Sequence, residues 1–167
     1  MKLIFLFLFA LTLICPLPAP AQNKLIIIVR HAEKAALETE GNPDPELSEA
    51  GKQRAERFKQ VIGRYRPGAL YSTNYRRTRE TAEPIAQKRD KEVQIYDPRL
   101  PKDLIDSIMS SKIKRHVVVG HSNTAPVLAN LIVGKEVFRN LEESEYSVIY
   151  LIRLKNGRVT ETRLLDY

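Results

Sequence analysis

Two short apolar runs constrain the fold of this chain more than any other feature. Leu25–Val29 and Val117–Val119 contain only aliphatic residues, most of them β-branched. Continuous apolar runs of this length are typical of strands that are covered on both faces, as in parallel sheets. Each run leads within two residues to a histidine, His31 or His121. The sequence therefore predicts two buried strands, each ending at a histidine.

The remaining pattern alternates helices with strands. Ser48 is a plausible cap for a helix that ends near residues 63–68, and Asn156-Gly157 is a strong signal for a tight hairpin. The other predicted elements are strands at 69–71 and 93–96, helices at about 74–88, 103–110 and 124–133, and hairpin strands at 146–154 and 158–165. This order predicts an α/β fold: a three-layer sandwich with a mainly parallel central sheet flanked by helices and an antiparallel C-terminal hairpin at the edge.

The first residues have the plan of a secretory signal peptide. Met1-Lys2 precedes the apolar segment Leu3–Ile14, and Ala19-Pro20-Ala21 offers a small-x-small cleavage pattern. We therefore expect a signal peptide at 1–21, a folded domain at 22–167, export to the periplasm or the extracellular space, and no stable membrane insertion after cleavage. The alternatives are an uncleaved anchor, a buried amino-terminal strand or a lipid anchor at Cys15. Cleavage removes the single cysteine and with it any disulfide.

The charge balance suits an anionic partner. The chain carries 27 Lys and Arg against 20 Asp and Glu, a formal net charge of +7, which fits a phosphorylated small molecule, a nucleic acid or an acidic membrane surface. Tyr65-Arg66 and Tyr75-Arg76-Arg77 superficially fit nucleic-acid binding, but the expected export argues against it. We predict no metal site, because the chain has only three histidines and no H-E-x-x-H pattern. Gly63–Gly68 has the glycine spacing of a nucleotide loop, but Ala69 replaces the required lysine.

Both histidines follow strands, at the sheet edge where α/β folds bind ligands. A neutral imidazole is a competent nucleophile toward phosphorus, and the planar guanidinium of arginine binds phosphate oxygens in pairs. Arg30 beside His31 therefore fits a phosphate clamp, and the arginine-rich run 71–82 enters a helix start, which attracts anions.

Four segments in order resemble the histidine phosphatase superfamily, the phosphoglycerate mutase-like proteins. These segments are Val29-Arg30-His31-Ala32, residues 44–51 with Leu47-Ser48-Glu49-Ala50-Gly51, the arginine-rich run, and residues 118–124. The resemblance implies that His31 is the nucleophile that accepts the phosphoryl group and that Arg30 and Arg77 clamp it. It also implies that His121 holds a phosphoryl oxygen, with no cofactor needed.

The resemblance predicts an exported, metal-independent phosphohydrolase that cleaves a phosphomonoester through phosphohistidine. The substrate class is a phosphorylated small molecule or a glycolipid. The alternatives are a phosphohistidine or phosphoramidate phosphatase, a phosphomutase, or an inactive phosphate-binding module. A mutase is disfavoured because the mutases of the family are longer and carry inserted segments. The sequence carries no prediction of oligomeric state.

The general acid has no clear motif. One branch of the superfamily places an acidic residue directly after the second histidine, where this chain has Ser122 and Asn123. The candidate acids are Glu33, Asp97 and Asp103, with Glu92 and Asp106 in the same region as Asp97 and Asp103. Lys34, Asn123 and Arg99 are candidate substrate contacts, as is Lys102. Without an acid, the enzyme would favour phosphoramidates, acyl phosphates or esters of acidic alcohols.

Overall fold

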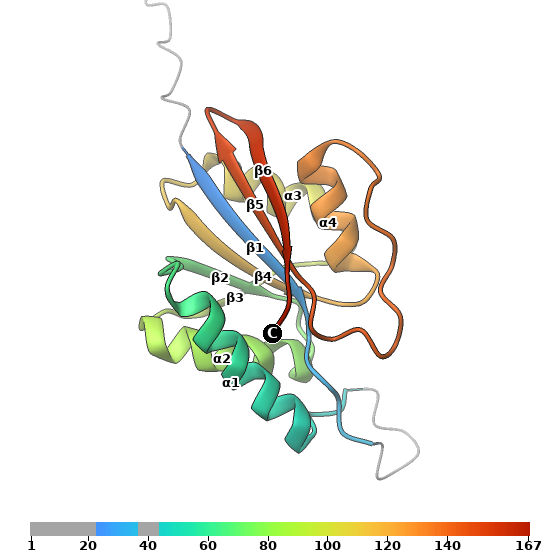
Figure 1. Cartoon of the computed structure of the whole chain (residues 1–167). Coiled ribbons are helices and arrows are strands. Elements are labelled where there is room, and N and C mark those ends of the chain that lie inside the picture. Colours follow the sequence, from blue (N-terminus) through green and yellow to red (C-terminus); the bar gives the residue numbers. More distant parts are fainter. Residues whose placement is uncertain (1–22, 37–43) are drawn as a thin grey trace, which may run out of the picture.

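The computed structural model describes residues 23–36 and 44–167. This part of the chain forms a central sheet with helices on both of its faces (Figure 1). In chain order the elements are β1 (Lys24–Arg30), α1 (Glu49–Gly63), β2 (Ala69–Ser72), α2 (Arg76–Arg89), β3 (Val93–Ile95), α3 (Pro101–Ser110), β4 (Arg115–Gly120), α4 (Thr124–Val133), β5 (Ile149–Lys155) and β6 (Arg158–Leu165).

The sheet confirms the predicted fold class. Its strand order is β3-β2-β4-β1-β5-β6. The pairs among β3, β2, β4 and β1 are parallel, whereas β5 pairs with β1 and β6 pairs with β5 in the antiparallel sense. The hairpin turns at Asn156-Gly157, where both residues have positive φ, as its turn type requires. A mainly parallel sheet with an antiparallel hairpin at one edge is therefore present.

Two separate cores bury the two faces of the sheet. Ile27, Val117 and Leu151 face the core against α1 and α2, which contribute residues such as Phe58 and Ile85. The alternate residues of the same strands face the core against α3 and α4, with Ile26, Val118 and Tyr150 from the sheet and Leu104 and Leu128 from the helices. Both faces of β1 and β4 are thus covered, which is why their apolar runs are continuous rather than alternating.

Some element boundaries differ from prediction. β5 begins at Ile149 rather than Tyr146, because Tyr146 belongs to the preceding loop and packs its ring against Arg30. α3 begins at Pro101, two residues before the predicted start, since proline is well suited to the first helical position. α2 runs to Arg89 and ends at Asp90 in the left-handed conformation.

The register of the sheet brings the two histidines together. Arg30 at the end of β1 is opposite Gly120 at the end of β4, and the backbone N–H of His31 donates to the carbonyl of Gly120 at 2.9 Å. β2 lies on the other side of β4, with Ser72 opposite Val119. The carboxyl ends of three adjacent strands therefore meet at one edge, and the segments that follow them converge there.

The segment Leu47–Gly51 attaches α1 to the backbone that follows His31. The Ser48 side chain caps the helix by accepting from the Gly51 N–H at 3.1 Å, and the Ser48 N–H donates to the Glu33 carbonyl at 2.9 Å. A Cβ at Gly51 would lie 2.2 Å from the same Glu33 carbonyl oxygen, a distance that no side chain tolerates. Glycine at this position is therefore a packing requirement.

The predicted signal peptide at 1–21 lies outside the described residues. Within residues 23–36 and 44–167, none of the helices has the length and apolar character needed to cross a membrane.

Candidate active site

A cleft of about 500 Å³ lies at the carboxyl edge of the sheet. It is lined by Arg30, His31, Lys34, Tyr75, Arg77, Pro98, Arg99, His121, Ser122, Asn123, Thr124 and Glu143. Seven of these residues were candidates for catalysis or substrate contact in the sequence analysis: Arg30, His31, Lys34, Arg77, Arg99, His121 and Asn123. Lys102, also a candidate substrate contact, does not line the cleft. Four side chains from the ends of β1 and β4 and the start of α2 form its base: Arg30, His31, Arg77 and His121.

His31 is held with one ring nitrogen unprotonated. Its Nδ1 lies 2.7 Å from the Ala32 carbonyl oxygen. Because a carbonyl can only accept, Nδ1 carries the proton and Nε2 keeps its lone pair. Burial, together with the nearby His121, Arg77 and Arg30, lowers the pKa of His31 to about 3, against a raising effect of the Ala32 hydrogen bond. The imidazole is therefore neutral at neutral pH.

Arg77 faces this nitrogen. Its Nε donates to His31 Nε2 at 3.3 Å. The guanidinium is therefore close enough to donate to the oxygens of a phosphoryl group that is bound to Nε2. Its Cζ lies 4.4 Å from the centre of the Tyr75 ring, and Asp44 approaches its other side at 3.6 Å. Arg77 occupies the first turn of α2, where the Arg76 N–H donates to the Asp44 carboxylate at 2.8 Å, so this helix start already attracts an anionic group.

Arg30 is buried but not fully satisfied. Its side chain is only 2% exposed. Its Nη1 donates to the carbonyls of residues 142, 143 and 145 at 2.7, 3.2 and 3.3 Å, and its Cζ lies 4.1 Å from the centre of the Tyr146 ring. The Nε atom has no partner among the described residues. A buried guanidinium N–H without an acceptor is costly, and an anion in the cleft is the kind of group that would satisfy it.

His121 is oriented by a threonine pair. Its Nε2 shares a hydrogen bond with the Thr73 hydroxyl at 2.9 Å, and Thr73 in turn contacts the Thr78 hydroxyl at 3.0 Å. The His31 and His121 rings lie 5.3 Å apart and nearly perpendicular. Burial, with the nearby Arg77 and Arg30, lowers the pKa of His121 to about 4. Its Nδ1 has no protein partner in the described part of the chain.

The candidate acids are not brought to the base of the cleft. Glu33 points away to pair with Arg54 at 2.7 Å, and this contact keeps the pKa of Glu33 low against the effect of burial. Asp97 is held by the exposed Arg99 at 2.6 Å, which lowers the Asp97 pKa to about 2. Asp103 lines a separate hollow with Asp97. Glu92 and Asp106 do not line the cleft either.

Sequence reasoning missed the acidic residue that does reach the cleft. Glu143 lies on the loop between α4 and β5, with its Oε2 atom 2.6 Å from Arg30 Nη2 and its Oε1 atom 3.6 Å from Lys34 Nζ. Hydrogen bonding to Arg30 lowers the pKa of Glu143, so this carboxylate is ionised. No sequence pattern pointed to this loop, which lies more than 110 positions after Arg30. Tyr146 on the same loop was assigned to a strand.

The described residues contain no cluster of three or more potential metal ligands from His, Cys, Asp and Glu.

The fold and the site define a class of protein. Residues 26–101 match the model of the histidine phosphatase superfamily, branch 1. This match agrees with the resemblance that the sequence motifs of the chain show to the same superfamily.

Solved structures share the fold at low sequence identity. A candidate phosphohistidine phosphatase, SixA, from Agrobacterium tumefaciens is 20% identical with a TM-score of 0.65, over 84% of this chain and 97% of that one. A candidate alpha-ribazole-5'-phosphate phosphatase from Escherichia coli is 13% identical with a TM-score of 0.70, over 86% and 96%. The protein histidine phosphatase SixA in complex with tungstate is 13% identical with a TM-score of 0.68, over 85% and 96%. No curated protein matches the chain.

Proposed function

We propose that this chain is an exported, metal-independent phosphohydrolase that transfers a phosphoryl group to His31 and then to water. One observation carries the proposal: the unprotonated Nε2 of a neutral, buried His31 accepts from the Arg77 guanidinium at 3.3 Å. The unpartnered Nε of Arg30 adds a second buried donor in the same cleft. A nucleophile surrounded by fixed cationic donors is the arrangement that phosphoryl transfer requires.

The reaction has two steps. In the first, the Nε2 lone pair attacks phosphorus, a P–N bond forms, and the bond from phosphorus to the leaving group breaks. In the second, water attacks phosphorus, the P–N bond breaks, and inorganic phosphate leaves while Nε2 regains its lone pair. Arg77 and Arg30 neutralise the phosphoryl oxygens in both steps, and His121 Nδ1 is the remaining ring nitrogen available to one of them.

The leaving group must take up a proton with little help from the protein. Glu33, Asp97 and Asp103 lie outside the cleft or in ion pairs, and Glu143 is ionised by its contact with Arg30. Substrates whose leaving groups are stable without an acid therefore fit best, such as esters of acidic alcohols.

A second candidate function is the hydrolysis of phosphohistidine or another phosphoramidate. The absence of a positioned acid among the described residues favours it, and two similar structures carry the name SixA with the description phosphohistidine or protein histidine phosphatase. Comparing a phosphohistidine peptide with aryl phosphates as substrates distinguishes the two.

The first test is hydrolysis of p-nitrophenyl phosphate in EDTA. We expect turnover by the natural sequence, a loss of more than about a thousandfold in His31→Ala, and a loss of about a hundredfold or more in Arg77→Ala. Arg79→Ala, two positions from Arg77 on the exposed face of α2, is the matched control and should keep full activity. Equal turnover in His31→Ala and the natural sequence would remove His31 from the mechanism.

Two parts of the proposal need their own experiments. Radiolabelled substrate quenched during turnover should leave label on the protein that is lost in acid and absent from His31→Ala. Export is tested by the amino-terminal residue of the protein recovered from its native host: Gln22 is expected, and Met1 would contradict cleavage.

A further inference from the structure

One group of cationic side chains lies far from the cleft. Nine of its 27 Lys and Arg residues are exposed near the amino-terminal ends of the strands and make no ion pair within the described part of the chain: Arg64, Arg66, Lys88, Lys91, Lys112, Lys114, Arg115, Lys155 and Arg158. Of its 20 Asp and Glu residues, only Asp90 and Glu92 lie on the same connections. We call these nine residues the basic pole.

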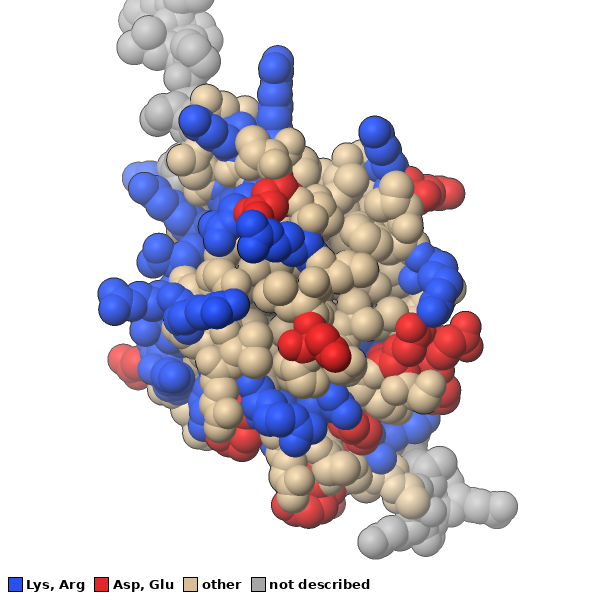
Figure 2. Space-filling model, in the orientation of Figure 1, with Lys and Arg blue, Asp and Glu red and all other residues tan. Residues whose placement is uncertain are grey.

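The basic pole is continuous across the molecule. Lys114, Arg115 and Lys155 line one shallow hollow where β1, β4 and β5 come together. Arg115 also donates to the carbonyl of Arg66 at 2.9 Å, which joins this hollow to the turn after α1. The end of the Lys88 side chain lies beside Gly63 at the end of α1. Figure 2 shows blue side chains at the top and left of the molecule, and others at its right edge and lower centre.

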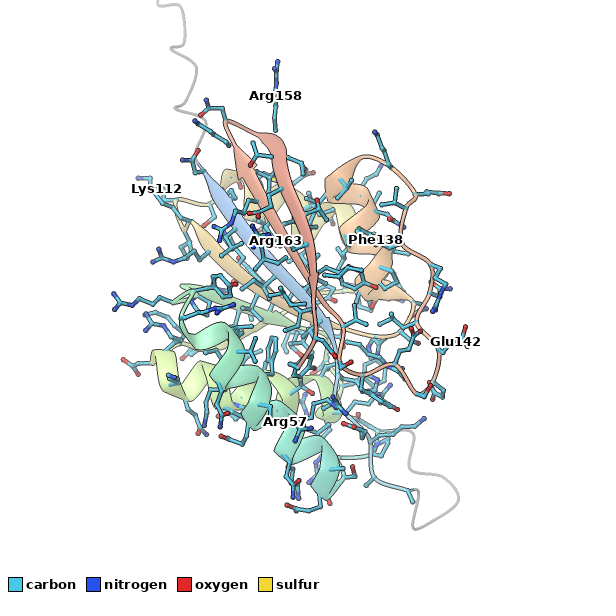
Figure 3. The ribbon with its side chains drawn as sticks, viewed as in Figure 1. Arg57, Lys112, Phe138, Glu142, Arg158 and Arg163 are labelled. Atoms are coloured by element: carbon cyan, nitrogen blue, oxygen red, sulfur yellow. The ribbon has the colours of Figure 1, made fainter. Side chains whose placement is uncertain are left out.

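The ion pairs of the protein lie mainly elsewhere. Those of Arg30, Arg54, Arg76 and Arg139 lie around the cleft, along α1 and on the loop between α4 and β5. Near the pole, the carboxylate of Glu161 is already shared by Arg153 and Arg163. Figure 3 shows Lys112 and Arg158 at the upper end of the molecule, well away from Glu142 on the loop between α4 and β5. The pole is therefore an acid-poor surface opposite the cleft.

The amino-terminal segment joins the fold at this same pole. The first described residue is Asn23, which lines the hollow with Lys114 and Lys155. The 22 residues before it include the apolar segment Leu3–Ile14. A chain that is delivered to a membrane by this segment thus presents its basic pole to the lipid headgroups first.

We propose that the basic pole docks the folded protein on an anionic lipid surface, with the cleft facing away from the bilayer. Cationic clusters bind anionic headgroups through the surface potential, without inserting. Tyr65, which lies between Arg64 and Arg66, is only half-buried, but the Arg64 guanidinium packs 4.9 Å from the centre of its ring. This covered ring makes a single-stranded nucleic acid a poorer occupant. In this orientation the substrate comes from the aqueous side. The inference is independent of the proposed function, because the two surfaces are at opposite ends of the strands.

The test uses the full chain and phosphatidylcholine vesicles with and without phosphatidylglycerol. The double variant Lys114→Glu, Lys155→Glu is compared with the control Lys52→Glu, Arg57→Glu, whose exposed residues lie on α1. Both variants change the net charge equally, and the amino-terminal segment is the same in all proteins. We expect co-sedimentation with anionic vesicles to fall more than about tenfold in the pole variant only, and to fall with added salt. Hydrolysis of p-nitrophenyl phosphate, or thermal unfolding if none is seen, shows that both variants are folded.

Three outcomes would overturn the proposal. Equal loss in the pole and control variants would show a response to net charge alone. Equal binding to neutral and anionic vesicles would show that the apolar segment, rather than the pole, holds the protein. Tighter binding of a DNA duplex than of anionic vesicles, lost in the pole variant, would make nucleic acid the occupant.

Discussion

Replacing Glu143 by glutamine should tighten the binding of phosphate. The Glu143 carboxylate accepts a hydrogen bond from Arg30 Nη2 at 2.6 Å and lies 3.6 Å from the Lys34 ammonium. A phosphoryl group that binds Arg30 must compete with this carboxylate and is repelled by its charge. Glutamine keeps the size of the side chain but removes the charge. The backbone carbonyls of this loop, which also accept from Arg30, are unaffected.

The size of the effect follows from the exposure of the pair. Arg30 is 2% exposed, but the Glu143 side chain is 71% exposed, so solvent screens the interaction. An ion pair of this kind contributes about 0.5 to 1 kcal/mol, which corresponds to a dissociation constant about two- to fivefold lower for phosphate in Glu143→Gln. We therefore expect a lower inhibition constant for inorganic phosphate and a kcat for p-nitrophenyl phosphate within about twofold of the natural sequence.

The assay is competitive inhibition by inorganic phosphate, with Glu142→Gln as the control. Glu142 is the neighbouring residue, but its carboxylate pairs with Arg139 and only its backbone carbonyl contacts Arg30. Weaker phosphate binding in Glu143→Gln would refute the competition. A kcat that falls for an alkyl phosphate but not for p-nitrophenyl phosphate would instead make Glu143 the missing general acid.

Three further predictions concern packing, pH and the support of the clamp. Gly51→Ala should lower the free energy of unfolding by about 1 to 3 kcal/mol, because its Cβ would meet a backbone oxygen. In the control Gly63→Ala, the Cβ would meet only the end of a lysine side chain, so the free energy of unfolding should stay nearly unchanged. Thermal unfolding compares the two variants. Since the pKa of His31 is lowered to about 3, His31 should stay unprotonated, and kcat/KM should not fall through its protonation, as the pH falls from 7 to about 5. A fall of kcat/KM centred near pH 6.5, the ordinary histidine pKa, that titration of the substrate does not explain would contradict this. Tyr146→Leu removes the ring against Arg30 and should lower kcat/KM by about tenfold, while Tyr146→Phe should keep it; an equal loss in both would assign the effect to the hydroxyl.

The fold was predictable because the features that determine it are local in the sequence. Continuous apolar runs identified β1 and β4, Ser48 identified the start of α1, and Asn156-Gly157 identified the hairpin turn. The position of the cleft followed as well, because parallel strands end at the same edge. The predicted residues at its base come from these strand ends and from one helix start.

The loop after α4 was not predictable, for a physical reason. It holds Arg30 mainly through the backbone carbonyls of residues 142, 143 and 145. Carbonyl groups are present at every position, so this contact leaves no trace in the residue types. Glu143 is part of an acidic run that reads as a solvated surface, and its partner Arg30 is 113 positions away.

The net charge shows why location matters more than composition. We expected the surplus of +7 to suit an anionic partner, but most of the unpaired cations lie at the basic pole. β1 is seven residues long and so separates the two ends by about 20 Å, more than twice the screening length of about 8 Å at physiological salt. The pole therefore contributes little to the potential in the cleft, where Arg30 and Arg77 act at contact distance. It follows that Lys114→Glu, Lys155→Glu should leave the KM for a soluble phosphate ester unchanged at physiological salt, and that a several-fold rise in KM would show long-range attraction of the substrate by the pole.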